Sequence, residues 1–113
     1  MKAILIIALL ALASPFAHAG GDPGAGAQKS KPCAACHGAD FNTPISADIP
    51  LLAGQHEDYL ARVLSDYKSG VRKNPIMSGQ AGALSSQDIV DLAAYFAGLP
   101  GKLKVIPLHR LVQ

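Results

Sequence analysis

The sequence predicts an all-α domain of three or four helices. Apolar side chains recur at helical spacing in two segments, residues 57–68 and 85–98. No stretch after residue 19 alternates β-branched and polar residues as a strand would. The 113 residues suit one domain, and with three Phe, three Tyr and no Trp its core is short of large side chains. Such a domain is expected to rely on a disulfide, a metal or a cofactor.

Residues 1–19 have the features of a secretory signal peptide. Lys2 precedes an apolar stretch at residues 3–13, and a small-x-small pattern predicts cleavage after Ala19. The apolar stretch is shorter than the roughly 20 residues that a membrane-spanning helix needs. We therefore expect an exported, periplasmic protein with no stable membrane insertion.

The first helix is predicted to begin at Asp22 and Pro23, because Asp is a favoured N-cap and Pro is favoured at the first helical position. It runs toward Cys33, but Pro32 is expected to interrupt it. Residues 38–54 have no helical or alternating period and are rich in Pro, Gly, Asn and Asp. They are expected to form a long loop with a function of its own.

The second predicted helix, residues 57–68, has acidic residues in its first turn and a glycine just after its end. Residues 70–82 follow as a second predicted loop, which contains Met77. The last helix has the clearest start, with Ser85 as N-cap and an acidic residue three positions later. A glycine and a proline are expected to end it.

Residues 20–100 are thus expected to form the folded domain, and residues 101–113 a C-terminal tail. The tail is apolar, but Pro107 prevents one continuous helix. We expect the tail either to pack on its own domain or to dock onto a partner subunit.

Both cysteines lie in one motif, Cys33-Ala-Ala-Cys36-His37. In an exported protein this spacing is the attachment signature of c-type haem. The two thiols can add to the two vinyl groups of one porphyrin, and the adjoining imidazole can then bind the iron from one face. The motif predicts one covalently attached haem c with His37 as the proximal ligand.

Other classes of function fit the sequence less well. The two cysteines also suit a disulfide or a thioredoxin-like redox pair, but the redox pair is expected in a strand–helix–strand context. Ten Lys and Arg against eight Asp and Glu lack the basic excess of a nucleic-acid-binding protein. No residues are arranged for hydrolytic catalysis by an acid–base pair or a nucleophile.

The sixth ligand of the iron is predicted to be Met77, the single methionine after the signal segment. A thioether favours ferrous over ferric iron and so raises the reduction potential. Met77 lies between two predicted helices and not on an apolar helical face, where a methionine usually packs a core. The alternatives are His56, His109 and an open sixth position.

Several motifs occur in an order that resembles the class I c-type cytochromes. They are CAACHG at residues 33–38, PLLAGQ at 50–55, Tyr59-Leu60, Gly70-Val71-Arg72, the Met77 loop, and Leu84-Ser85 leading into DLAAYF at 91–96. The resemblance covers residues 21–100 and is strongest to small bacterial monohaem cytochromes and to single halves of tandem dihaem ones.

The resemblance implies a cytochrome c-like fold of three to four helices around one haem. It implies thioether bonds from Cys33 and Cys36 and axial ligation by His37 and Met77. It also implies that the carbonyl of Pro50 accepts a hydrogen bond from the His37 ring, which would fix the tautomer of that ring.

In this family the first and last helices cross closely, which implies contact of Gly26 with Tyr95 or Phe96. A further expectation concerns the surface, where a basic rim of four side chains either docks redox partners or is simply solvated. These side chains are Lys29, Lys31, Arg72 and Lys73.

The function implied is that of a periplasmic monohaem carrier, not an enzyme. It would pass one electron between respiratory or dehydrogenase partners. The alternatives are a dedicated cytochrome subunit of an oxidoreductase complex and, further off, a haem sensor or enzyme with an open iron site.

Overall fold

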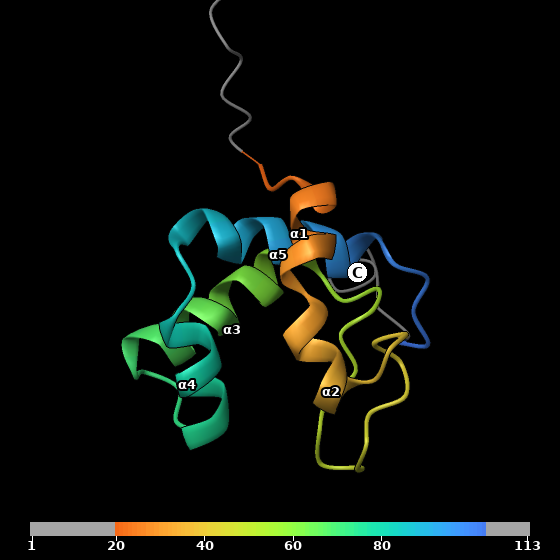
Figure 1. Ribbon diagram of the computed structural model, residues 1–113, viewed down its shortest axis with the longest axis horizontal. Helices are drawn as coiled ribbons and strands as arrows, with labels where there is room; N and C mark the ends of the chain where they lie inside the picture. The colour runs from red at the N-terminus through yellow and green to blue at the C-terminus, as the bar shows by residue number, and fades with distance from the viewer. Residues whose placement is uncertain (1–19, 104–113) are drawn as a thin grey trace, which may run out of the picture.

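The structure, a computed structural model, describes residues 20–103, which contain helices and no strand. Figure 1 shows their arrangement, and the bounds are α1 (Pro23–Lys29), a 3-10 helix η1 (Lys31–Cys33), α2 (Ala34–His37), α3 (Glu57–Ser69), α4 (Pro75–Gly82) and α5 (Ser86–Gly98). The predicted all-α class is confirmed, and no helix in this part of the chain is long and apolar enough to cross a membrane. The predictions for residues 1–19 and 104–113 lie outside the described residues.

The first helix begins and breaks where the sequence predicts. The Asp22 carboxylate accepts the backbone N–H groups of Gly24 and Ala25 at 2.8 and 3.3 Å, which satisfies donors that the first helical turn leaves free. The chain then leaves α1 at Ser30 and continues through η1, which contains Pro32. The predicted interruption by Pro32 is confirmed.

Helices α1 and α5 cross at a glycine (Figure 1). A Cβ atom at Gly26 would lie 2.1 Å from the backbone oxygen of Asp91 and 2.7 Å from Cβ of Tyr95. Any side chain at this position would push the two backbones apart. Of the two aromatic contacts expected for Gly26, the structure shows the one with Tyr95.

Residues 38–54 form an ordered loop that is anchored by one aromatic ring. Phe41 is buried, and its ring packs edge-on against Phe96 with centroids 4.8 Å apart. Its backbone oxygen accepts the N–H groups of Leu52 and Ala53 at 2.9 and 3.2 Å, so the loop folds back on itself. The core that results contains Phe41, Ala53, Leu60, Leu92, Ala93 and Phe96.

The two longer helices agree with the sequence. Helix α3 ends at Gly70, which adopts a left-handed conformation with φ of 79°. At the start of α5, the Ser85 hydroxyl accepts the N–H of Asp88 while the Asp88 carboxylate accepts the N–H of Ser85. This reciprocal capping box explains why the start of α5 is so well marked in the sequence.

The prediction of a loop over residues 70–82 is wrong, because residues 75–82 form α4. The missed signal is Asn74-Pro75, a cap and a first-position proline of the same kind as Asp22-Pro23. Helix α4 buries only Ala81 and contains two glycines, so it lacks the apolar period by which the other helices are recognised.

Candidate cofactor site

The Cys-x-x-Cys-His motif occupies a short helical segment after α1. Cys33 is the last residue of η1, and Cys36 and His37 lie in α2. Both thiols are free and half-buried. The two cysteines therefore lie about one helical turn apart, on the continuous helical segment formed by η1 and α2.

The chain turns sharply immediately after the motif. Gly38 has φ of 89°, and a Cβ atom there would lie 2.2 Å from the backbone oxygen of Thr43. Only glycine accepts both conditions without strain. The turn directs the following loop back past His37.

The loop supplies a partner for the buried imidazole. His37 is 6% exposed, and its Nδ1 lies 2.8 Å from the carbonyl oxygen of Pro50. Because a carbonyl only accepts, Nδ1 carries the hydrogen and the lone pair on Nε2 is left for a metal. The hydrogen bond expected between His37 and Pro50 is confirmed, and it is one function of the long loop.

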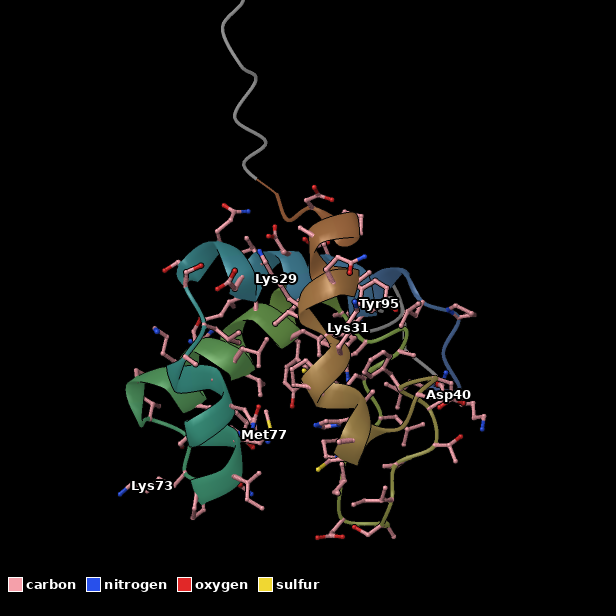
Figure 2. The ribbon with its side chains drawn as sticks, viewed as in Figure 1. Lys29, Lys31, Asp40, Lys73, Met77 and Tyr95 are labelled. Carbon is pink, nitrogen blue, oxygen red and sulfur yellow. The ribbon has the colours of Figure 1, made fainter. Side chains whose placement is uncertain are left out.

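Met77 lies in the first turn of α4 and not in a loop. The Asn74 side chain accepts the N–H groups of Ile76 and Met77, both at 3.1 Å, and so fixes the start of the helix. Met77 is half-buried, and Figure 2 shows its side chain pointing from α4 toward the side on which α2 lies. Among the described helices, α4 packs only on α3.

The donor groups on η1, α2 and α4 are of the kinds that suit a haem attached through two thioethers. Two thiols, one imidazole nitrogen and one thioether sulfur are the groups that such a haem needs from a protein. Within residues 20–103 no three His, Cys, Asp or Glu side chains converge to hold a metal ion by themselves. A porphyrin provides the four other nitrogen ligands, so no such cluster is needed.

A thiol redox pair fits the structure less well. Burial raises the pKa of the Cys33 thiol, whereas reactive redox cysteines have a lowered pKa. The described part of the chain also lacks the strands that surround a thioredoxin-like motif.

The other candidate ligands lie elsewhere. His56 is exposed at the N-cap of α3, and its side chain makes no capping bond. His109 falls outside the described residues.

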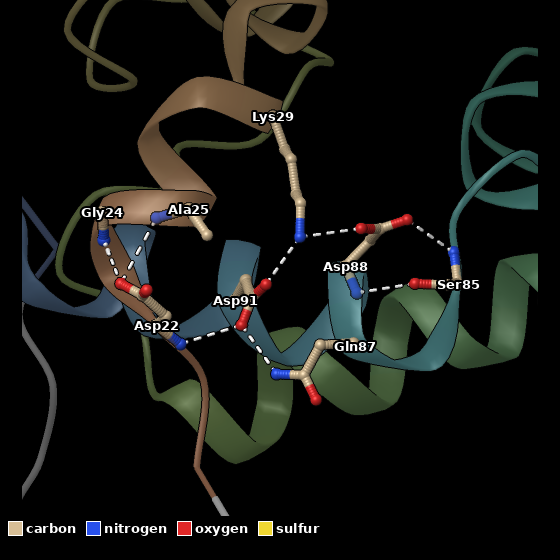
Figure 3. A network of polar contacts seen from close by, with 8 residues as sticks. All are labelled: Asp22, Gly24, Ala25, Lys29, Ser85, Gln87, Asp88 and Asp91. Atoms are coloured by element: carbon tan, nitrogen blue, oxygen red, sulfur yellow. Dashed lines mark hydrogen bonds and ion pairs between the residues drawn. The ribbon is translucent and has the colours of Figure 1, made fainter. Parts of the chain in front are cut away.

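The predicted basic rim is wrong for Lys29. Its ammonium group lies 2.8 Å from Asp88 and 2.6 Å from Asp91, as Figure 3 shows, and it joins α1 to α5. Arg72 donates from Nε to the Tyr67 hydroxyl at 3.1 Å. Lys31 and Lys73 are exposed.

Sequence reasoning missed one contact at the end of α4. Lys68, in the last turn of α3, donates to the backbone oxygens of Gly82 at 3.2 Å and of Leu84 at 2.5 Å. The partners are more than a dozen residues away along the chain, so no local pattern indicates them.

An all-α domain with a Cys-x-x-Cys-His motif and an anchored, buried histidine defines a c-type cytochrome. The model of the cytochrome c family matches residues 22–100, and the chain belongs to this family. It carries one covalently bound haem c, which confirms the predicted cofactor.

Individual relatives agree with this assignment. The chain is 47% identical over 98 residues to cytochrome c4 of Pseudomonas aeruginosa, covering 86% of this chain and 48% of the relative. It is 36% identical over 111 residues to a protein of Thiomonas intermedia named thiosulfate dehydrogenase electron acceptor, and this match covers 96% of this chain and 49% of the relative. The crystal structure of reduced cytochrome c4 from Pseudomonas stutzeri superposes with a TM-score of 0.68 at 41% identity. The superposition covers 74% of this chain and 48% of the cytochrome c4 chain.

The chain thus spans about half the length of these relatives. The resemblance to class I c-type cytochromes is confirmed.

Proposed function

We propose that this chain is a periplasmic carrier of one electron. Cys33 and Cys36 would hold the haem through thioether bonds, and His37 Nε2 and Met77 Sδ would bind its iron. The observation that carries the proposal is the buried His37 ring, whose Nδ1 is fixed by Pro50 and whose Nε2 is left free. When bound, haem c supplies one iron that alternates between the ferric and ferrous states.

The surrounding residues set the properties of this centre. The carbonyl of Pro50 holds the His37 ring in one orientation and tautomer, and makes Nε2 a better electron donor. Met77 favours the reduced state because a thioether is a soft, weak ligand. With His37 and Met77 both bound to the iron, the centre would offer no open position to a substrate, and electrons would be exchanged with protein partners.

The chain would consist of three segments. Residues 1–19 direct export and are removed after Ala19, residues 20–100 form the cytochrome domain, and residues 101–113 are a tail. Redox proteins are the donor and the acceptor.

A second candidate is a dedicated electron-accepting subunit of an oxidoreductase. The likeness to the Thiomonas protein, named for accepting electrons from thiosulfate dehydrogenase, favours it. Copurification of the intact mature chain with one dehydrogenase through size-exclusion chromatography would support this candidate. A monomer that exchanges electrons with several partners would support the free carrier.

Absorption spectra of the mature holoprotein test the central proposal. They are recorded oxidised, reduced, and reduced under carbon monoxide. We expect a sharp c-type α band that carbon monoxide leaves unchanged, and in the oxidised state the weak band of a methionine–iron bond. Met77→Ala should open the iron to carbon monoxide, whereas the control His56→Ala should behave as the wild type.

Other results would contradict the proposal in specific ways. A wild-type spectrum that carbon monoxide changes would show an open site and favour a sensor or an enzyme. A His56→Ala variant that alone becomes open would move the sixth ligand to His56.

A further inference from the structure

Helix α4 carries Met77 but contributes little apolar burial of its own. Of its residues only Ala81 is buried, and Ile76 next to Met77 is 69% exposed. Gly79 and Gly82 weaken the helix further, because glycine loses more backbone freedom on folding than other residues. Other contacts must hold α4 in place.

Lys68 provides such contacts at the end of α4. The last carbonyls of a helix have no partner within the helix, and a positive charge there is favourable. The Lys68 ammonium group donates to the backbone oxygen of Gly82, the last residue of α4, and to that of Leu84 just beyond it. One side chain of α3 therefore ties down the segment that leaves α4.

The contact lies on the single helix that supports α4. Within residues 20–103, α4 packs on α3 and on no other helix. Lys68 thus acts where α4, which carries Met77, packs on the one described helix that it contacts.

We propose that Lys68 is a positioning residue for Met77: by binding the carbonyls of Gly82 and Leu84 it holds α4 against α3 and keeps the thioether at the iron. This inference rests on the proposed function, in which Met77 is the sixth ligand. Loss of the contact lets α4 move away from α3 while α1, α3 and α5 stay folded.

The test compares three variants of the reduced holoprotein in a carbon monoxide titration. Lys68→Met removes the N–H donors of the ammonium group and keeps a side chain of similar length. Lys68→Arg retains donors, and the matched control Lys73→Met removes the same charge from an exposed side chain. Figure 2 shows Lys73 and Met77 pointing in opposite directions.

Lys68→Met should bind carbon monoxide at concentrations that leave the wild-type spectrum unchanged, because one to two lost hydrogen bonds make displacement of Met77 about five- to tenfold easier. The methionine–iron band of its oxidised form should weaken. Lys68→Arg and Lys73→Met should, like the wild type, keep spectra that carbon monoxide leaves unchanged at those concentrations. Helix content and its urea midpoint, measured by circular dichroism, should change little in all three.

Two results would overturn the inference and leave the proposed function intact. In the first, Lys68→Met binds carbon monoxide as Lys73→Met does, although the wild type shows the methionine–iron band. In the second, Lys68→Met loses its helix content together with its methionine ligation, which would mean that Lys68 supports the whole fold. If the wild type itself lacks the band, the proposed ligand Met77 fails and the inference fails with it.

Discussion

The α1–α5 crossing and the α3–α4 pair are built on different principles. At the crossing, the backbones touch at Gly26, and the buried Asp91 accepts bonds from the backbone N–H of Asp22, from Lys29 and from Gln87 (Figure 3). Helix α4 buries a single residue and is held on α3 by exposed polar contacts.

This difference separates stability from ligand control. Close backbone packing and a buried, fully bonded carboxylate make the crossing costly to disturb. A few exposed hydrogen bonds can open with little loss elsewhere, because local opening has its own, smaller free energy. We therefore expect changes at the crossing to affect unfolding, and changes around α4 to affect the sixth ligand.

The same substitution should have opposite effects in the two regions. Gly26→Ala places a Cβ atom 2.1 Å from the backbone oxygen of Asp91 and should destabilise the domain by about 3 kcal/mol or more. Gly79→Ala, whose Cβ atom would meet nothing within 4 Å in the described part of the chain, should stabilise α4 by about 0.5 to 1 kcal/mol. Urea unfolding of the holoproteins should show the loss for Gly26→Ala, whereas the gain for Gly79→Ala should appear as harder displacement of Met77 with little change in the urea midpoint. Equal urea midpoints for the two variants would refute the contrast.

The carboxylate at the crossing should give the domain an acid-sensitive element. The hydrogen bond from Lys29, followed by those from Asp22 and Gln87, lowers the pKa of Asp91 below its ordinary 3.8. A carboxyl group whose pKa is lower in the folded state stabilises the fold above its unfolded pKa, and this stabilisation is lost as the pH falls through the folded pKa.

Asp91→Asn tests this element, because asparagine resembles the protonated carboxyl group. It should reduce the free energy of unfolding by about 1 to 2 kcal/mol at neutral pH. The difference from the wild type should persist down to about pH 4 and shrink as the pH falls further, where wild-type Asp91 gains its proton. The control Asp66→Asn, on α3, should show no such difference, and a constant difference across the pH range would contradict the assignment.

Local signals allowed much of this fold to be predicted from the sequence. Asp22-Pro23 and Ser85 mark helix starts through side chains that bond the adjacent backbone, so the information lies within a few residues. The same logic applied to Asn74-Pro75 would have found α4. The apolar period that marks the other helices is absent from α4, because this helix buries one residue.

The site was predictable to the extent that its chemistry is local. Cys33, Cys36 and His37 lie within five consecutive residues, and their spacing alone predicts the cofactor. The bond from His37 to Pro50 came from the family resemblance, since thirteen residues separate the two. The contacts of Lys68 and Lys29 depend on tertiary packing, and Lys29 was therefore assigned to the surface although it joins α1 to α5.

The smallest effects should distinguish the two helix caps. Ser85→Ala removes a hydroxyl that accepts the N–H of Asp88, and Asn74→Ala removes an amide that accepts the N–H of Ile76 and Met77. Each change should cost about 1 kcal/mol of local helix stability. Because α5 forms the crossing, the loss at Ser85 should appear in the urea midpoint of the whole domain.

The loss at Asn74 should instead appear at the iron. Because we expect α4 to open without the rest of the fold, Asn74→Ala should make displacement of Met77 by carbon monoxide about fivefold easier and leave the urea midpoint almost unchanged. Ser85→Ala should do the reverse. If both caps changed the urea midpoint equally and neither changed carbon monoxide binding, α4 would unfold only with the domain, and the distinction between a rigid crossing and a separately held ligand helix would be wrong.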